Sequence, residues 1–244
     1  MAHIPRLYTP TRLEPGPLAL EGALARRVST VLRLKESDRF LVFSGDGKEW
    51  QVRIENIGRQ RVHVTVEEEL RSSPLQAPQL ELAVSIVRAN RMDWAIEKCT
   101  EAGADMIQPI TTDYANRGSA DSRSRRERWE RIAIEATEQC GRLYVPDILE
   151  PLAFSEWLEQ RHDTVFFGDP AGIPWESARA QIPAEGTLSF VVGPEGGFSP
   201  QETEALRSAN AVGVCLGPYT LRTETGALVA AALVRSSAVG QQGK

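Results

Sequence analysis

The stretch that decides the fold is residues 188–234, which read LSFVVGPEGGFSPQETEALRSANAVGVCLGPYTLRTETGALVAAALV. It contains two copies of one plan, in which a short apolar run is followed by a Gly-Pro turn and the start of a helix. The runs Leu188–Val192 and Val212–Leu216 are typical of buried strands, because they are short, apolar and rich in β-branched residues. Helices are predicted from Ser199, where Ser-Pro-Gln-Glu forms a capping box, and from about Thr223.

The first of the two breaks, Gly193–Gly197, has three glycines in five residues. Glycine allows positive φ and lets another molecule approach the backbone closely. The sequence lacks the Walker A and Rossmann glycine patterns, and neither loop contains lysine. An adenosine-like group therefore suits these loops better than a polyphosphate. The alternative is that the glycines only form tight turns in an α/β sheet.

Together, VVGPEGGFSPQE and LGPYTLRTET resemble the C-terminal motifs of the SPOUT methyltransferases. More narrowly, they resemble the RsmE-type branch, which methylates N3 of a uridine in 16S ribosomal RNA. The resemblance implies a C-terminal trefoil knot, S-adenosylmethionine bound in the knot loops, and a homodimer that buries the knot. A third break from strand to loop is predicted at Phe167-Gly168-Asp169-Pro170, and the resemblance implies that it forms another wall of the cofactor pocket. The cofactor-binding residues expected are Phe167, Gly168, Val192, Gly193, Pro194, Glu195, Gly196, Gly197, Leu216, Gly217, Leu221 and Thr225.

Residues 1–72 are predicted to form a small antiparallel β domain, with a helix near 21–34 and strands at 40–44, 50–57 and 61–67. The segment VLRLKESDRFLVFSGDGKEW resembles the PUA-like RNA-binding barrel of the same family. The alternative is that its arginines only keep the barrel soluble. Residues 73–79 read SPLQAPQ, with two prolines in seven residues, and are predicted to be a linker.

Residues 80–244 alternate apolar strand patterns with helical patterns, which predicts an α/β domain with a mostly parallel sheet. Its last helix is apolar on nearly every side over Ala227–Val234, so it must be covered all round. A two-fold partner could cover one side, as the expected homodimer would. The alternative is that one subunit buries the whole helix.

Catalysis is assigned to Arg222 and Glu224, which follow the second Gly-Pro pair. Arg222 would stabilise negative charge on the uracil oxygens, and Glu224 would accept the N3 proton. Glu224 lies in the first turn of a predicted helix, where it equally suits a role in compensating the helix dipole. The RNA-binding residues expected are Arg6, Arg26, Arg27, Arg33, Arg117 and Tyr219.

Two positions depart from the family pattern. Tyr219 stands where the family usually has arginine, and Asp113-Tyr114-Ala115 stands where it commonly has Glu-Arg-Ser. Arg117 is expected to compensate. The leading hypothesis is methylation of N3 of a uridine in 16S ribosomal RNA, within the assembled small subunit. The alternatives are a SPOUT methyltransferase acting on another RNA and a non-catalytic RNA-binding or ribosome-assembly factor.

The length, composition and charge of the chain are those of an ordinary globular protein. The chain has 244 residues, 41% of them hydrophobic, and no apolar run of the ~18 residues that a membrane helix needs. Its net charge is −5, but residues 1–71 hold 12 basic and 10 acidic groups, so the N-terminal part is the expected polyanion-facing end. The three cysteines have no metal spacing, so we expect no metal and three small buried thiols in a reducing cytoplasm.

Overall fold

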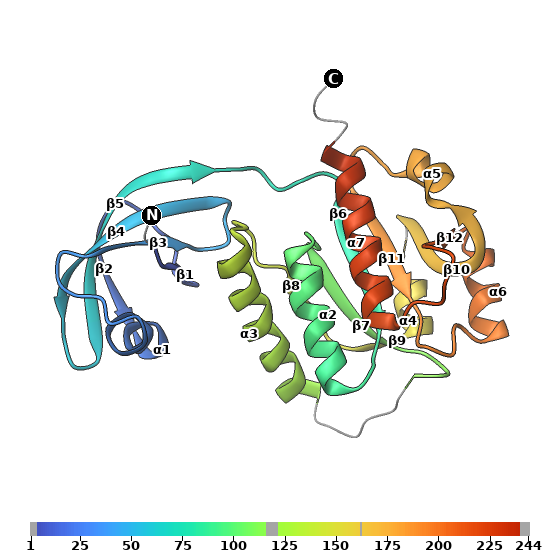
Figure 1. The fold of residues 1–244 in the computed structure, drawn as a ribbon, viewed down its shortest axis with the longest axis horizontal. Coiled ribbons are helices and arrows are strands. Elements are labelled where there is room, and N and C mark those ends of the chain that lie inside the picture. The colour runs from blue at the N-terminus through green and yellow to red at the C-terminus, as the bar shows by residue number, and fades with distance from the viewer. Residues whose placement is uncertain (1–3, 116–121, 162, 240–244) are drawn as a thin grey trace. The chain divides into compact units, whose positions relative to one another are not determined.

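The computed structural model describes residues 4–115, 122–161 and 163–239. The chain forms two compact units (Figure 1). The first comprises the residues up to Leu75 together with Thr137–Val145, and the second comprises Gln76–Ala136 and the chain from Pro146 onward. The sequence did not indicate that residues 137–145 belong with the N-terminal unit.

The first unit is built on a five-stranded sheet with the order β1-β3-β4-β5-β2. β1 pairs parallel with β3, and the other neighbours are antiparallel. Alternation buries Val62, Val64 and Val66 on one face of β5 and leaves His63 exposed. The strands are β1 (Arg6–Tyr8), β2 (Gly16–Glu21), β3 (Arg39–Phe43), β4 (Lys48–Ile57) and β5 (Arg61–Ser72).

Two features of this unit differ from the expectation. No strand was predicted before residue 40, but both β1 and β2 lie there. Both are at an end of the strand order, where the missing N–H of Pro17 leaves the ladder intact. The predicted helix is shorter, with α1 (Gly22–Arg26) passing into the π-helical turn η1 (Arg27–Val31).

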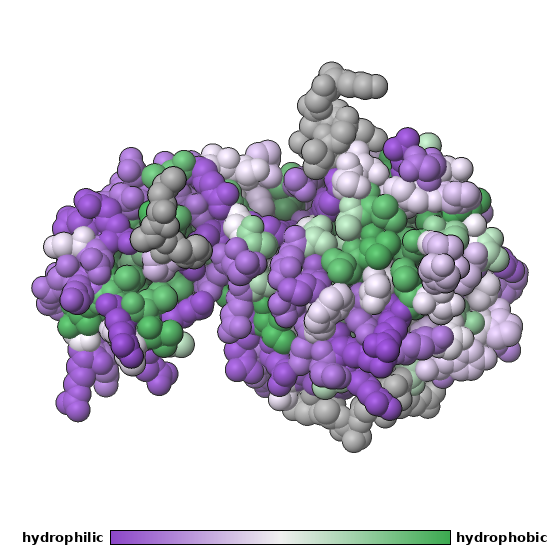
Figure 2. All heavy atoms as spheres, in the orientation of Figure 1, coloured by the Kyte–Doolittle hydropathy of each residue, from purple (hydrophilic) through white to green (hydrophobic). Residues whose placement is uncertain are grey.

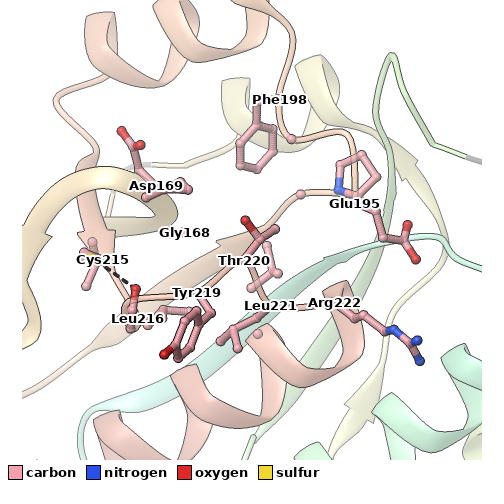
Figure 3. A pocket seen from close by; sticks show the side chains of 18 of the residues that line it. Gly168, Asp169, Glu195, Phe198, Cys215, Leu216, Tyr219, Thr220, Leu221 and Arg222 are labelled. Atoms are coloured by element: carbon pink, nitrogen blue, oxygen red, sulfur yellow. Dashed lines mark hydrogen bonds between the residues drawn. The ribbon is translucent and has the colours of Figure 1, made fainter.

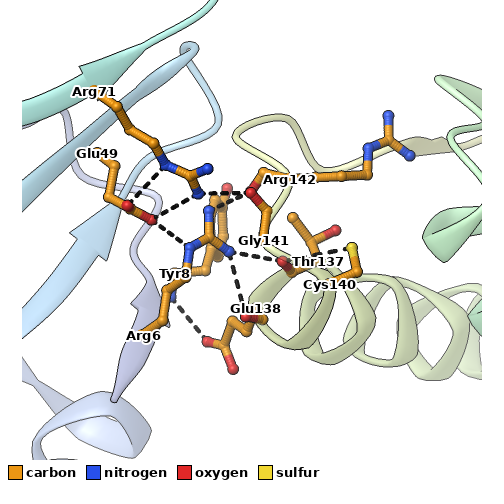
Figure 4. Close-up of polar contacts among 9 residues, drawn as sticks. All are labelled: Arg6, Tyr8, Glu49, Arg71, Thr137, Glu138, Cys140, Gly141 and Arg142. Atoms are coloured by element: carbon orange, nitrogen blue, oxygen red, sulfur yellow. Dashed lines mark hydrogen bonds and ion pairs between the residues drawn. The ribbon is translucent and has the colours of Figure 1, made fainter. Parts of the chain in front are cut away.

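Segment 137–145 is held in the first unit by charged hydrogen bonds (Figure 4). Arg6 donates to the carboxylate of Glu49, and its Nη1 donates over 2.7 Å to the carbonyl oxygen of Thr137. Arg71 Nε donates to the same carboxylate over 2.9 Å. Arg6 thereby satisfies a carbonyl in the last turn of α3 (Ser122–Cys140), where helical carbonyls lack intrahelical partners.

The second unit contains a seven-stranded sheet with the order β12-β10-β11-β6-β7-β8, and β9 also pairs with β7. Every pairing in it is parallel, which confirms the α/β prediction. Its strands are β6 (Gln79–Ser85), β7 (Met106–Thr111), β8 (Asp147–Ile148), β9 (Leu152–Ala153), β10 (Thr164–Pro174), β11 (Thr187–Val192) and β12 (Val212–Cys215).

Helices cover both faces of this sheet (Figure 1). α2 and α7 pack side by side and α7 also contacts β6 and β11, whereas α4 packs against α6 and β7. Trp157, Phe154 and Leu206 form one core with residues of the central strands. The helices are α2 (Ala89–Glu101), α3, α4 (Phe154–Glu159), α5 (Trp175–Ala178), η2 (Arg179–Gln181), α6 (Pro200–Ser208) and α7 (Thr223–Val239).

The strand β10 runs through Phe167-Gly168-Asp169-Pro170, where a break from strand to loop was expected. It continues to Pro174, and its pairing with β12 shifts register between Gly168 and Ile173. The two backbones approach closely there, because a Cβ on Gly172 would lie 2.4 Å from the carbonyl carbon of Gly213. In the described part of the chain, no helix is long and apolar enough to cross a membrane.

Candidate functional site

Three neighbouring strands place their carboxyl ends at one edge of the second sheet. β10 pairs parallel with both β11 and β12, so the loops that follow these strands meet. They enclose a cavity of about 300 Å³ (Figure 3), which is within the range of small-molecule sites. It is lined by Gly168, Asp169, Pro170, Val192, Gly193, Pro194, Glu195, Gly197, Phe198, Val214, Cys215, Leu216, Gly217, Pro218, Tyr219, Thr220, Leu221, Arg222 and Gly226.

The cavity wall is mostly backbone and apolar side chains, with three charged residues, Asp169, Glu195 and Arg222. Asp169 is fixed by its own turn, since its Oδ1 accepts a 2.8 Å hydrogen bond from the backbone N–H of Ala171. Two carboxylates and one guanidinium in an otherwise neutral wall suit a ligand that combines apolar rings with positive charge.

The capping box at the start of α6 is present as predicted and reaches further than predicted. Ser199 Oγ accepts from the backbone N–H of Glu202 over 3.2 Å, and Glu202 Oε2 accepts from the N–H of Ser199 over 2.8 Å. The second carboxylate oxygen of Glu202 accepts from the N–H of Asp113 over 2.9 Å, and Ser199 Oγ donates to Asp113 over 2.6 Å. The loop after β7 is therefore fixed to α6. It places Tyr114 beside Gly196, where an added Cβ would lie 3.4 Å from the Cβ of Tyr114.

A cluster of charges lies beside the cavity. Arg91, in the first turn of α2, donates to Glu195 and lies with its Nε 3.7 Å from an oxygen of Glu224. Glu224 is 7% exposed, and its Oε2 is buried without a hydrogen-bond partner among the described residues. Arg222 is exposed and extends from the cavity on the side of Glu195 (Figure 3). A ligand that reaches this cluster would meet a cation and carboxylates together.

Nine of the twelve expected cofactor residues line this cavity. Phe167 does not, because its side chain packs in the core between sheet and helices. Gly196 and Thr225 do not line the cavity either. The residues that line the cavity but were not expected are Asp169, Pro170, Phe198, Val214, Cys215, Pro218, Thr220 and Gly226. Three of them had a signal in the sequence, because Asp169 and Pro170 belong to the predicted break after Phe167 and Pro218 belongs to the second Gly-Pro pair.

The six expected RNA-binding residues fall in different settings. Arg26 and Arg33 are exposed, and Tyr219 is 83% exposed at the cavity. Arg27 is paired with Glu138 over 2.6 Å. Arg117 lies outside the described residues.

Arg6 is corrected from an RNA contact to a structural residue. Its side chain is 8% exposed, and its guanidinium donates to Glu49 and to carbonyl oxygens of segment 137–145. Burial lowers the pKa of Arg6 from its usual value, against the opposing effect of Glu49. Arg6 is therefore not proposed as an RNA contact, because a contact to RNA phosphate requires guanidinium N–H groups that are free to donate.

The cysteines only partly match the expectation. Cys99 is buried, and burial raises the pKa of its thiol to about 12. Cys140 is exposed and Cys215 is half-buried, which corrects the expectation of three buried thiols. Cys215 borders the cavity, where its Sγ lies 3.3 Å from the carbonyl oxygen of Gly217. Within the described ranges, no three His, Cys, Asp or Glu residues are grouped as metal ligands would be.

Comparison with known proteins assigns the family. Residues 74–235 match the model of the RNA methyltransferase domain, and residues 30–67 match the RNA methyltransferase PUA domain. The chain belongs to the RNA methyltransferase family. This confirms the resemblance read from the two Gly-Pro motifs and the PUA-like character of the first unit.

Relatives of this RNA methyltransferase cover most of its length. The ribosomal RNA small subunit methyltransferase E of Rickettsia conorii is 32% identical and aligns over 85% of this chain and 84% of its own. The protein of the same name from Bacillus subtilis is 28% identical over 91% of each chain. A solved structure of ribosomal RNA small subunit methyltransferase E from Neisseria gonorrhoeae, bound to S-adenosyl methionine, is 29% identical. It superposes with a TM-score of 0.88 over 96% of this chain and 98% of its own.

Proposed function

We propose that this protein methylates N3 of a uridine in small-subunit (16S) ribosomal RNA, with S-adenosylmethionine as the methyl donor. The observation that carries the proposal is the cavity at the carboxyl ends of β10, β11 and β12. The chain that forms it has relatives named ribosomal RNA small subunit methyltransferase E. A ribosomal target would place the protein in the cytoplasm, and the assembled small subunit is the proposed substrate particle.

The cavity residues fit S-adenosylmethionine. Glycine and proline loops leave backbone groups accessible to an adenine edge, and Leu216, Leu221 and Phe198 offer apolar surface. Asp169 and Glu195 supply negative charge for a ligand that carries a sulfonium and an ammonium. S-adenosylmethionine supplies the methyl group when it is bound. We therefore propose as cofactor contacts the nine expected residues that line the cavity.

The protein's own groups must prepare the uridine. Uridine N3 carries a proton that leaves only well above neutral pH, so a base or an anion-stabilising group is needed for N3 to form its new bond. The exposed guanidinium of Arg222 would stabilise negative charge on the uracil carbonyl oxygens. Oε2 of Glu224 is buried and has no hydrogen-bond partner in the described part of the chain, and it is the acceptor proposed for the proton.

The target base must also be accessible. N3 lies on the Watson–Crick edge, so a paired uridine has to leave its helix before it can react. Exposed aromatic side chains commonly stack on unpaired bases. Tyr219 and Tyr114 are 83% and 56% exposed, and Tyr219 borders the cavity. Because aromatic side chains stand where the family has arginine, a related RNA with a different phosphate path is the second candidate substrate.

We also propose a homodimer and, as the family resemblance implies, a knotted C-terminal region. The support for the dimer is α7, where Leu228, Val229 and Leu233 are only half-buried and Ala232 is exposed. Figure 2 shows apolar side chains gathered over this part of the second unit. A second copy would bury them by two-fold contact.

Two measurements test the proposed function. Mass spectrometry should find 3-methyluridine in small-subunit ribosomal RNA from cells that contain the protein, and find it missing when the gene is deleted. Calorimetric titration with S-adenosylmethionine should show binding to the purified protein. Binding with unchanged ribosomal methylation would favour another RNA, whereas no binding would favour a cofactor-free RNA-binding or assembly factor.

A further inference from the structure

Arg91 joins two parts of the site that are distant in sequence. It donates through Nη1 to Glu195 of the loop after β11, and its Nε lies 3.7 Å from Oε1 of Glu224 in the first turn of α7. The three side chains are 31%, 42% and 10% exposed. Arg91 itself is in the first turn of α2, so one guanidinium holds together one loop and two helices.

The two oxygens of Glu224 have different surroundings. Oε1 faces Arg91, whereas Oε2 is buried and has no hydrogen-bond partner among the described residues. Leaving a buried carboxylate oxygen unpaired costs free energy, so such an atom calls for an explanation. Glu224 also sits between Arg222 and Gly226, which both line the cavity. A ligand N–H that enters from the cavity would satisfy the unpaired oxygen.

We propose that Arg91 is a positioning residue for methyl transfer, which orients the Glu224 carboxylate so that Oε2 stays available to the N3–H of the target uridine. This inference rests on the proposed function. The proton would move from N3 to Oε2, and the electron pair left on N3 would form the new bond to the methyl carbon. The bond between that carbon and the sulfonium sulfur would break, and its electron pair would stay on the sulfur of the departing thioether. Arg91 touches neither atom and acts through Glu224.

Arginine suits this task better than an ordinary surface cation. Its planar guanidinium presents Nε and Nη1 in fixed directions, so it can hold two carboxylates at once with a defined geometry. Lysine would supply the charge but not the fixed fork. The positive end of α7 also favours a carboxylate at Glu224, and Arg91 adds a cationic side chain 3.7 Å from its Oε1.

The test compares Arg91→Met, Arg91→Lys and Glu224→Gln, together with the double variant Arg91→Met/Glu224→Gln. Methyl incorporation into small-subunit particles gives kcat and KM, and thermal unfolding gives stability. Lys98→Ala is the matched control, because Lys98 lies on the same helix and also bridges two carboxylates, Glu97 and Glu101. It should leave kcat unchanged.

Arg91→Met should lower kcat by about tenfold or more, with KM for the particle within a few-fold, and Arg91→Lys should recover part of the loss. The double variant should be no slower than Glu224→Gln alone, because Arg91 acts through that carboxylate. Full additivity in kcat, or a loss that follows the unfolding temperature alone, would overturn the inference. A wild-type protein that does not methylate the particle would instead refute the proposed function, and the role of Arg91 with it.

Discussion

Thr223 Oγ1 donates a 3.0 Å hydrogen bond to the carbonyl oxygen of Gly193. Thr223 is 2% exposed and begins α7, while Gly193 begins the glycine loop after β11. This one bond connects the two Gly-Pro units that are adjacent in the cavity wall. The shape of the cavity therefore depends on a side chain that does not itself line it.

The first prediction concerns this bond. Thr223→Val keeps the size of the side chain and removes the hydroxyl, which leaves a carbonyl oxygen without its donor. The affinity for S-adenosylmethionine should fall about 3- to 10-fold, in line with ~0.5–1.5 kcal/mol for a hydrogen bond. Calorimetry measures the change, and Thr223→Ser should retain wild-type affinity. Equal affinity in both variants would show that the bond does not shape the site.

The second prediction tests the glycine loops. A Cβ on Gly193 would meet the ring of Phe198 at 3.2 Å, so Gly193→Val disturbs the protein as well as the cavity. Gly168 gives a better test of binding alone, because a Cβ added there would lie no closer than 3.9 Å to its nearest protein atom, Leu216 Cδ1. Gly168→Val should fill cavity space and abolish detectable cofactor binding while the unfolding temperature stays near that of the wild type. A folded variant with full affinity would place the cofactor elsewhere.

The third prediction concerns stability in acid. Hydrogen bonds from Arg39 and Arg53 lower the pKa of Glu67 from 4.5 to about 2. A carboxyl with a depressed pKa in the folded state stabilises the protein above its unfolded pKa. That contribution is then lost as the pH falls from about 4.5 towards 2. Glu67→Gln should lower the urea midpoint at pH 7 but differ less from the wild type at pH 3. An equal deficit at both pH values would contradict the assignment.

Local signals in the sequence predicted the parts of the site that local chemistry forms. The strand expected at residues 188–192 is β11 (Thr187–Val192), and the one expected at 212–216 is β12 (Val212–Cys215). The Ser199–Glu202 capping box was predictable because its partners are three residues apart.

Pairing between distant segments explains what the sequence did not show. β10 continues past Gly168 and Pro170, residues typical of a turn, because Ile173 and Pro174 pair with β12 again after a shift of register. Arg91 and Glu195 are 104 residues apart, and no periodicity relates them. The sequence placed Arg6 among the RNA contacts, but its guanidinium is buried by distant residues, namely segment 137–145, Glu49 and Phe43.

The fourth prediction concerns association. If a second copy covers α7, Ala232→Arg should separate the copies, because Ala232 is exposed and a long charged side chain there would oppose an apolar contact. Light scattering at micromolar concentration should give a dimer mass for the wild type and a monomer mass for the variant. A monomeric wild type would contradict the proposal. An unchanged unfolding temperature at low protein concentration would show that the substitution leaves the subunit folded.

The last prediction concerns the chemistry of Arg222. Its side chain is exposed and lines the cavity, and among the described residues Arg222 forms neither of the ion pairs, to Glu195 and Glu224, that hold Arg91. If the guanidinium bound the cofactor in the ground state, its removal would change the cofactor affinity. If it stabilised the charge that develops on uracil in the transition state, its removal would change kcat. Arg222→Ala should therefore lower kcat by ~100- to 1,000-fold, the usual cost of removing an anion-stabilising donor. The cofactor dissociation constant should stay within several-fold. Arg222→Lys retains the charge without the planar fork, so its rate should lie between the two. Methylation of small-subunit particles by Arg222→Ala at the wild-type rate would refute this role, and a parallel loss of cofactor affinity would reassign Arg222 to binding.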